Sequence, residues 1–588
     1  MPVIGYLHDT RSHLSANEQR QNYWFAYVAE MLDQLGASAE AVELHKLTHS
    51  LSSLGVLIIG DSRSADLSEH ASFLSTWVER GGVLIGFAPE GLDPIFGNSY
   101  HSTTPEPDSP FHATALMRLQ KQPLTTGVLM PRFADAVIPL FGPVRKVVAH
   151  DSLSLATLLN VRGAEAPFPA ITTRTVGQGQ AHYFAFDVAQ TMWLLHKGRP
   201  IEGDSDLDGY LRLSDAVVVG NLPLDIPYAD MLLFLLQNML HRAGVPMIHQ
   251  VPPRRGDVCD FLIFFGGDDE GASEGIQVAA SDFMKERGLP YHINIMPRAD
   301  GTFGLSVAEH RHLLANGHEP SLHYNFIDGF NHPSPFSRED VLRQWDWYVR
   351  TFQHRPIATV NHWCRWCGWH EPAQWMSEAG GRADNSRIGV TSPPLNPVNH
   401  IGFAFGTAFP NYFYEDWQGE NRKIDFLNEP IACYEVGYLG EATDFPNLHN
   451  ALDLAAQFHY TMNFFYHPIY IARYPACRKA IDEILRYVGD RNLRVAFTGP
   501  DGLWEWWDAR SRSAISHLDN QGNKTRFVAQ CAYPEGMVVK VPTNMPRAQV
   551  VVDGKEAPFR CEEHFGFLYA LVVCPHGEHE VVVIEGDG

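Results

Sequence analysis

The stretch Cys-Asp-Phe-Leu-Ile-Phe-Phe-Gly-Gly-Asp-Asp-Glu, residues 259–270, decides how the centre of the chain folds. Its apolar run Phe261–Phe265 is typical of a parallel strand that is buried on both faces. Two glycines end the run, and the carboxylates of Asp268 and Asp269 follow at once. Because the loops at the carboxyl ends of parallel strands converge on one crevice, we expect both aspartates to lie at a functional site.

A second stretch, Gly-His-Glu-Pro-Ser-Leu-His at residues 317–323, contains another short predicted strand. Its last residue, His323, offers a nitrogen ligand or a base at the end of that strand. Carboxylates together with imidazole suit a hydrolytic metal site, since they are hard or borderline ligands and leave a coordination position for water.

Together the two stretches resemble the first two motifs of the polysaccharide deacetylase family, the NodB-homology or carbohydrate esterase 4 proteins. Phe-Phe-Tyr-His-Pro at residues 464–468 resembles the late strand whose histidine is the catalytic acid of that family. The resemblance covers residues 255–500 and implies a distorted (β/α) barrel. The order and spacing of the three pieces carry it, since each piece alone is a weak signal.

The resemblance also implies an activity and roles for four residues. Asp268 would be the general base that activates water, Asp269 and His323 would be metal ligands, and His467 would be the catalytic acid. The implied reaction is metal-dependent removal of an acyl group, chiefly acetyl, from a carbohydrate or a related amide or ester. Zinc is the default metal for such ligands, with cobalt or nickel as substitutes.

The chain departs from the family pattern at the second ligand histidine. The family places that histidine four residues after the first, where this chain has Ile327. His362, directly after a predicted strand, is the replacement we expect, and His332 is the alternative if its segment loops back. If neither residue binds, the site has lost its metal.

Three further residues are expected near the site. Arg365 is expected to orient the base aspartate through a charged hydrogen bond, with Arg355 as the alternative because the family's Arg-x-Pro-Tyr motif is absent. Trp363 and Trp366 are candidates for stacking on sugar rings, although tryptophans at this spacing are more often core residues.

Two other functions stay open at this point. One is a glycoside hydrolase on a related barrel, in which Asp269 would pair with Asp416 or Glu435. The other is a catalytically silent carbohydrate-binding or scaffold protein, suggested by Ile327 in place of the second ligand histidine.

Residues 1–250 alternate strand and helix patterns, which predicts a doubly wound α/β domain with a parallel sheet. Ser68–Phe87 and Gly177–Asp187 resemble parts of class I glutamine-amidotransferase-like domains. Catalytic members of that class need a nucleophilic cysteine, and no cysteine precedes Cys259. We therefore expect a non-catalytic domain that supports homo-oligomer formation. The predicted elements include strands at Val3–Leu7, Ala41–Leu44, Gly55–Gly60 and Val83–Phe87 and helices at Glu18–Leu35 and Ser68–Arg80.

The rest of the chain divides into two expected domains. Residues 255–505 alternate strands and helices in about seven units, as expected for a catalytic barrel, and the stretch 380–430 is expected to form loops over its mouth. Residues 510–588 contain short strands separated by Glu-Gly, Asp-Gly and His-Gly turns, which predicts a small antiparallel β-sandwich. The overall fold class is therefore α/β multidomain.

The composition limits the classes of binding partner and the cellular compartment that we expect. The formal net charge of −23 argues against nucleic acid and anionic membranes, since both call for clustered Lys and Arg. No window approaches the run of about 20 apolar residues that a membrane span requires, and the first residues read as a strand, not a signal peptide. The eight scattered cysteines are expected to be free thiols. These observations lead us to expect a cytoplasmic protein acting on a carbohydrate or a small acylated substrate.

Overall fold

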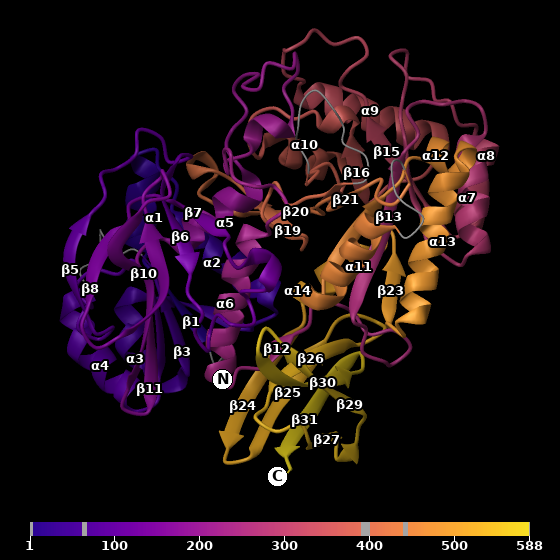
Figure 1. Ribbon diagram of the computed structural model, residues 1–588. Helices are drawn as coiled ribbons and strands as arrows, with labels where there is room; N and C mark the ends of the chain where they lie inside the picture. Colours follow the sequence, from indigo (N-terminus) through magenta and orange to yellow (C-terminus); the bar gives the residue numbers. More distant parts are fainter. Residues whose placement is uncertain (1–3, 61–66, 390–399, 439–444, 587–588) are drawn as a thin grey trace.

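The computed structural model describes residues 4–60, 67–389, 400–438 and 445–586. It shows an α/β protein built on several sheets, as expected from the alternating sequence patterns. Figure 1 shows the N-terminal sheet on the left, the central sheet at the upper right and the C-terminal strands at the bottom.

The N-terminal sheet has nine strands in the order β2-β1-β3-β4-β11-β10-β9-β6-β7. The first five are parallel, as predicted, but β10, β9, β6 and β7 extend the sheet in antiparallel fashion. The sheet is therefore mixed and only its first half follows the doubly wound pattern. The strands are β1 (Ile4–His8), β2 (Ala39–Glu43), β3 (Val56–Ile59), β4 (Val83–Phe87), β6 (Ala113–Leu119), β7 (Val137–Phe141), β9 (Leu153–Leu159), β10 (Glu165–Val176) and β11 (Gly179–Phe184). A separate antiparallel pair consists of β5 (Asn98–Thr103) and β8 (Arg145–Ala149).

The long helix predicted over Glu18–Leu35 is wrong. The structure has α1 (Thr10–Glu18), a 3-10 turn at Trp24–Tyr27, and then α2 (Val28–Leu35). Arg20 adopts a positive φ of 61°, which ends the first helix because that backbone conformation cannot continue an α-helix. The other helices of this half are α3 (Leu47–Ser50), α4 (Ala71–Glu79), α5 (Val188–Lys197) and α6 (Tyr228–Arg242).

The central sheet carries strands in the order β18-β21-β22-β13-β14-β15-β16-β17-β20-β19, and β23 also pairs with β13. Its inner strands are parallel, while β18 and β19 join antiparallel at the two ends. Among the described strands no pairing joins β18 to β19, so the sheet is curled without closing into the expected barrel. The strands are β13 (Phe261–Asp268), β14 (His292–Ile295), β15 (Glu319–Tyr324), β16 (Ala358–Asn361), β17 (Ala383–Asp384), β18 (His400–Ile401), β19 (Asn411–Tyr414), β20 (Lys423–Asn428), β21 (Cys433–Tyr434), β22 (Thr461–Phe465) and β23 (Val495–Thr498).

The stretch 380–430, expected as loops, instead supplies β17, β19, β20 and the edge strand β18. These strands are short, and their pairing depends on neighbours far away in sequence, so no local pattern marked them. The helices around this sheet are α7 (Ile276–Glu286), α8 (Val307–Ala315), α9 (Arg338–Phe352), α10 (Glu371–Ala379), α11 (Pro446–Phe458), α12 (Pro468–Arg473), α13 (Pro475–Asp490) and α14 (Pro500–Ser511).

The C-terminal strands form two antiparallel sheets, in the orders β12-β26-β30-β29 and β24-β25-β31-β27-β28. The strand β12 (Met247–Ile248) comes from the end of the first expected domain, residues 1–250, and pairs with β26. The connection is thus part of a sheet. The other strands are β24 (Ala514–Gln521), β25 (Lys524–Cys531), β26 (Met537–Pro542), β27 (Ala548–Val552), β28 (Lys555–Glu556), β29 (Phe559–His564), β30 (Phe567–Cys574) and β31 (Gly577–Glu585).

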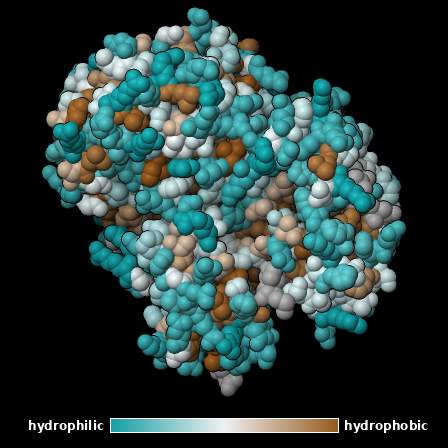
Figure 2. Space-filling model, turned by 180° about the vertical axis from the view of Figure 1, so that it is seen from behind, coloured by the Kyte–Doolittle hydropathy of each residue, from teal (hydrophilic) through white to brown (hydrophobic). Residues whose placement is uncertain are grey.

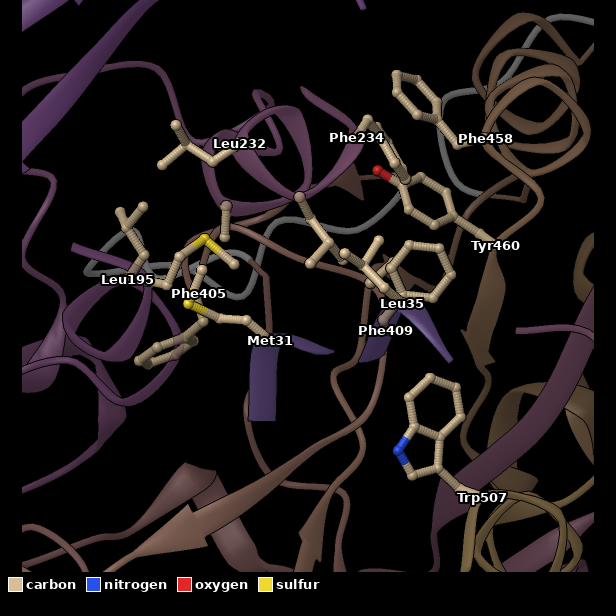
Figure 3. Close-up of a cluster of buried hydrophobic side chains, with 14 of the residues drawn as sticks. Met31, Leu35, Leu195, Leu232, Phe234, Phe405, Phe409, Phe458, Tyr460 and Trp507 are labelled. Atoms are coloured by element: carbon tan, nitrogen blue, oxygen red, sulfur yellow. The ribbon is translucent and has the colours of Figure 1, made fainter. Parts of the chain in front are cut away.

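One hydrophobic core runs through all these parts (Figure 3). Met31 and Leu35 of α2 face the same cluster as Phe409 and Tyr460 of the central region and Trp507 of α14. This shared burial means that the N-terminal half and the central sheet support one another.

The surface seen in Figure 2 is mostly polar, and the cysteines form no disulfide bonds among the described residues. Figure 2 shows hydrophilic residues over most of one face, with apolar residues scattered between them. None of the helices in the described ranges is long and apolar enough to cross a membrane. All eight cysteines are free, as predicted.

Candidate active site

Parallel strands of the central sheet bring the predicted site residues to one edge. Asp268 ends β13 and lies opposite Asn294 of β14, while His323 of β15 lies opposite Val360 of β16. His362 directly follows β16, and His467 follows β22. The carboxyl ends of neighbouring parallel strands share an edge, so these four side chains lie in one place.

Glu270, His323 and His362 form a compact group of possible metal ligands. One ligand atom from each lies within 4.8 Å of the others. The Nε2 atom of His362 is 2.8 Å from Oε2 of Glu270, and the two histidine rings are 5.2 Å apart at their centroids. Two imidazoles and a carboxylate are a common donor set for a catalytic divalent ion.

His323 presents a neutral ring nitrogen to this group. Its Nδ1 lies 3.2 Å from the carbonyl oxygen of Val360 and must donate to it, which leaves a lone pair on Nε2. That Nε2 atom is buried without a hydrogen-bond partner. Burial lowers the pKa of His323 to about 3, so the ring is neutral at physiological pH. A buried orphan nitrogen of this kind fits a metal ion.

Asp268 lies beside His323. Its Oδ1 accepts a hydrogen bond of 2.9 Å from the Asn294 amide, and its Oδ2 lies 3.5 Å from Nε2 of His323. Burial raises the pKa of Asp268 well above its usual range, against the opposing charge of His467. A carboxyl group with a raised pKa and a fixed orientation suits proton transfer near neutral pH.

His467 is held between two carboxylates. Its Nδ1 lies 2.5 Å from Oε1 of Glu435, and its Nε2 lies 3.4 Å from Oε1 of Glu270. Burial alone would lower the pKa of His467, but the charge of Glu435 and the hydrogen bonds to Glu435 and Glu270 outweigh it and raise the pKa well above its usual range. His467 is therefore an imidazolium at neutral pH. The same bonds from His362 and His467 overcome the burial of Glu270 and lower the pKa of that carboxylate.

Asp269, the ligand expected from the sequence, does not join this group. Its Oδ1 accepts backbone N–H bonds of 2.9 Å from both Gly271 and Met296, and its Oδ2 accepts one of 2.9 Å from Gln277. Burial raises the pKa of Asp269 to about 6 against the effect of these bonds. The side chain thus fixes the turn that follows β13.

Sequence reasoning missed Glu270, although a signal for it was present. Side chains alternate across a strand, so residues 268 and 270 face one side and residue 269 faces the other. In the structure β13 ends at Asp268, and the turn that follows, with a positive φ of 54° at Glu270, places the carboxylate of Glu270 against His362 and His467. The sequence offers Glu435 only as one carboxylate of a glycoside hydrolase pair, and its contact with His467 comes from the fold.

Arg365 does not reach Asp268, so the expected orienting contact is not formed. Its guanidinium donates to the carbonyl oxygens of Phe326, Leu211 and Ser334 at 3.3, 2.7 and 2.8 Å. Asn294 from β14 holds Asp268 instead. The arginine ties the site edge to the N-terminal half.

The two candidate tryptophans differ in exposure. Trp366 is only 1% exposed and packs on Phe413 and Arg387, so it offers no face to a sugar. Trp363 is 45% exposed, and its ring centroid lies 5.9 Å from that of His362. Of the pair, only Trp363 could contact a substrate beside the site.

The alternative residues lie in other roles. His332 contacts the carbonyl oxygen of Ile327 at 3.1 Å and is not part of the ligand group. Asp416 accepts the backbone N–H of Gln418 at 2.8 Å and begins a 3-10 turn. This role of Asp416 does not support its pairing with Asp269 as the two carboxylates of a glycoside hydrolase.

No protein-family model matches the sequence, and no curated protein matches it. Among solved structures, Agd3, described as a novel carbohydrate deacetylase, aligns over 99% of this chain and 98% of its own, with 11% identity and a TM-score of 0.41. PuuE allantoinase aligns over 43% of this chain and 91% of its own, with 15% identity and a TM-score of 0.29. The β-galactosidase from Rahnella sp. R3 aligns over 32% of this chain with 15% identity and a TM-score of 0.25, and the match spans only 28% of that enzyme's length. These identities and TM-scores are too low to assign a fold family or an activity to this chain.

Proposed function

We propose that the protein is a metal-dependent hydrolase that removes acyl groups, chiefly acetyl, from a carbohydrate or a related amide or ester. The observation that carries the proposal is the convergence of Glu270, His323 and His362 beside the buried Asp268 and the protonated His467. The motif order that resembles the polysaccharide deacetylases points the same way.

In this proposal Glu270, His323 and His362 hold one divalent ion, with Glu270 replacing Asp269 in the ligand set. Zinc suits two imidazoles and a carboxylate best, and cobalt or nickel could substitute. When bound, such an ion polarises the acyl carbonyl and lowers the pKa of a bound water. The orphan Nε2 of His323 and its donating Nδ1 support this assignment.

The acid and base are assigned by their surroundings. Asp268, oriented by Asn294, takes the proton of the attacking water. His467 donates a proton from Nε2 to the leaving amine or alcohol, because its Nδ1 is held by Glu435. Trp363 offers an aromatic face to the sugar next to His362.

Metal content and acetate release test the proposal together. Protein purified without chelator should contain close to one divalent ion per chain by elemental analysis, and it should release acetate from some member of a panel of acetylated sugars and amides. His323→Ala and Glu270→Gln should lose both the ion and the activity.

Asp269→Asn is the matched control. The amide oxygen of an asparagine can still accept the bonds from Gly271 and Met296, and the amide of Gln277 can turn to accept from it. This variant should keep its metal. Full metal retention in His323→Ala, or metal loss only in Asp269→Asn, would refute the ligand set.

A further inference from the structure

The segment Asp-Ser-Asp-Leu-Asp-Gly-Tyr-Leu-Arg-Leu-Ser-Asp, residues 204–215, plays no part in the proposed chemistry. It places aspartates at positions one, three, five and twelve and a glycine at position six. This is the spacing of a twelve-residue calcium-binding loop, in which those positions and the carbonyl at position seven supply oxygen ligands. Aspartate stands at position twelve, where such loops commonly have glutamate.

The fold gathers these carboxylates. Oxygen atoms of Asp204, Asp206 and Asp215 lie within 4.8 Å of one another. The two oxygens of Asp204 accept the backbone N–H groups of Asp208 at 3.1 Å and Gly209 at 2.8 Å, which curls the segment around them. Gly209 has a φ of 92°, a conformation that glycine adopts at low cost.

A separate observation points to a cation. The Oδ2 atom of Asp206 is buried and accepts no hydrogen bond. The Asp208 side chain is only 8% exposed, and its one charged contact is the Arg212 guanidinium. A buried carboxylate oxygen without a donor is costly unless a cation or a proton meets it.

The excess of carboxylates over cationic side chains around this loop also favours a bound cation. Four carboxylates face two cationic side chains here, because Arg199 donates to the carbonyl of Asp215 and to Ser205 while Arg212 meets Asp208. Burial raises the pKa of Asp206, and the charges of Asp215 and Asp208 raise it further against the Ser214 hydroxyl. The loop therefore carries uncompensated negative charge.

We infer that residues 204–215 bind one calcium ion through Asp204, Asp206 and Asp215, with Asp208 and the carbonyl of Tyr210 completing an all-oxygen shell. Calcium fits better than zinc because every donor is a hard oxygen, and better than magnesium because the loop supplies most of the ligands itself. This site is separate from the histidine site and does not depend on the proposed function.

The position of the loop gives the ion a structural consequence. Next to it, Ile201 and Gly368 exchange backbone hydrogen bonds of 2.8 and 3.1 Å, and the carbonyl of Leu211 accepts the N–H of Trp366 at 3.2 Å. The ring of Tyr210 lies 5.1 Å from that of Trp363. A bound ion would stiffen the segment Trp363–Gly368, which follows His362.

Calcium binding by the full chain tests the inference. After treatment with chelator and reloading of the histidine site with zinc, titration with calcium chloride alone should show one site by calorimetry, and the unfolding midpoint should rise with calcium concentration. Asp204→Asn and Asp206→Asn keep side-chain volume and should each weaken calcium affinity by about tenfold or more. The exposed neighbour Glu202→Gln is the matched control and should bind like the parent protein.

The readouts separate this site from the active site. His323→Ala should bind calcium normally, while Asp206→Asn should keep its zinc. Circular dichroism establishes that each variant is folded. No calcium binding by the parent protein, or equal affinity in Asp204→Asn, Asp206→Asn and the parent, would overturn the inference.

Discussion

Asp268 and His467 meet opposite demands within one small site. Asp268 must lose its proton to act as a base, whereas His467 must keep its proton to act as an acid. Asn294 holds the first group and Glu435 the second, and neither partner is a metal ligand in our proposal. Single substitutions can therefore separate proton transfer from metal binding.

We predict that Asp268→Asn keeps its metal but loses turnover by about 100-fold or more, the usual scale for loss of a general base. Asparagine preserves the volume and can still accept from Asn294, but it cannot take a proton. The measurement is acetate release at saturating substrate, with elemental analysis of the same preparation. Turnover equal to that of the parent protein would remove Asp268 from the mechanism.

The Glu435–His467 pair predicts a pH dependence. The raised pKa of His467 means that the acid stays protonated through neutral pH and is lost as pH rises through that pKa. Glu435→Gln removes the principal charge that holds this proton, so the alkaline limb of kcat/KM should move to lower pH. Tyr438→Phe is the control: it removes the 3.1 Å bond to Glu435 but leaves the charge of that carboxylate in place, so the limb should move less. An unchanged alkaline limb in Glu435→Gln would assign the acid to another group.

At the scale of elements, the end of β16 is the most unusual feature of the site. His362, which is buried, is followed by Trp363 and Cys364 with positive φ values of 54° and 53°. Non-glycine residues in this conformation cost on the order of 1–3 kcal/mol each and persist only when surrounding structure enforces them. Here the backbone N–H of Trp366 donates a hydrogen bond to the carbonyl of Leu211 just after the turn and holds it in place.

This turn points His362 inward and leaves Trp363 exposed, which favours a substrate-binding role for the tryptophan. Trp363→Ala should raise KM by about twofold to tenfold, the equivalent of an aromatic contact worth roughly 0.5–1.5 kcal/mol, while kcat and metal content change little. Phe73→Ala, an equally exposed aromatic on α4, is the matched control. A fall in kcat with an unchanged KM would instead indicate that the tryptophan positions His362.

At the scale of the whole molecule, the N-terminal half is bound tightly to the rest. The buried Arg510 of α14 donates to the carbonyls of Asp33 and Gln34 in α2 at 2.7 and 2.9 Å. Lys197 of α5 donates to the carbonyl of Asn411 at 3.1 Å. These contacts and the shared core of Figure 3 make the first half part of the scaffold of the site.

Residues 251–588 alone should therefore fail to fold stably. Removing the first half would expose the apolar cluster around Phe409, Tyr460 and Trp507, which favours aggregation. Thermal unfolding and limited proteolysis of the shortened chain, compared with the intact protein, provide the measurement. A soluble fragment with a cooperative transition near that of the intact chain would contradict the prediction. The expected homo-oligomer remains a prediction and is best measured by sedimentation of the intact chain.

Local sequence patterns were sufficient to predict the strands that build the site. The strand β13 begins at Phe261, where the apolar run predicted it, and continues to Asp268. The predicted strands at His323 and before His362 are β15 and β16. Hydrophobic periodicity and helix caps are read from neighbouring residues, so they survive without knowledge of the fold. Parallel topology then placed His323 and His467 at the edge next to Asp268.

Only the tertiary structure decided which carboxylate faces the histidines and which strands complete the sheet. Asp269 turns away because Met296 after β14 and Gln277 of α7 supply its hydrogen-bond donors, and both lie outside the motif. The strands β17 and β20 exist because of each other, since two short segments about forty residues apart pair only when the fold brings them together. The calcium-type spacing of residues 204–215 is readable in the sequence. Only the fold brings Asp204, Asp206 and Asp215 together and buries the unpartnered Oδ2 of Asp206.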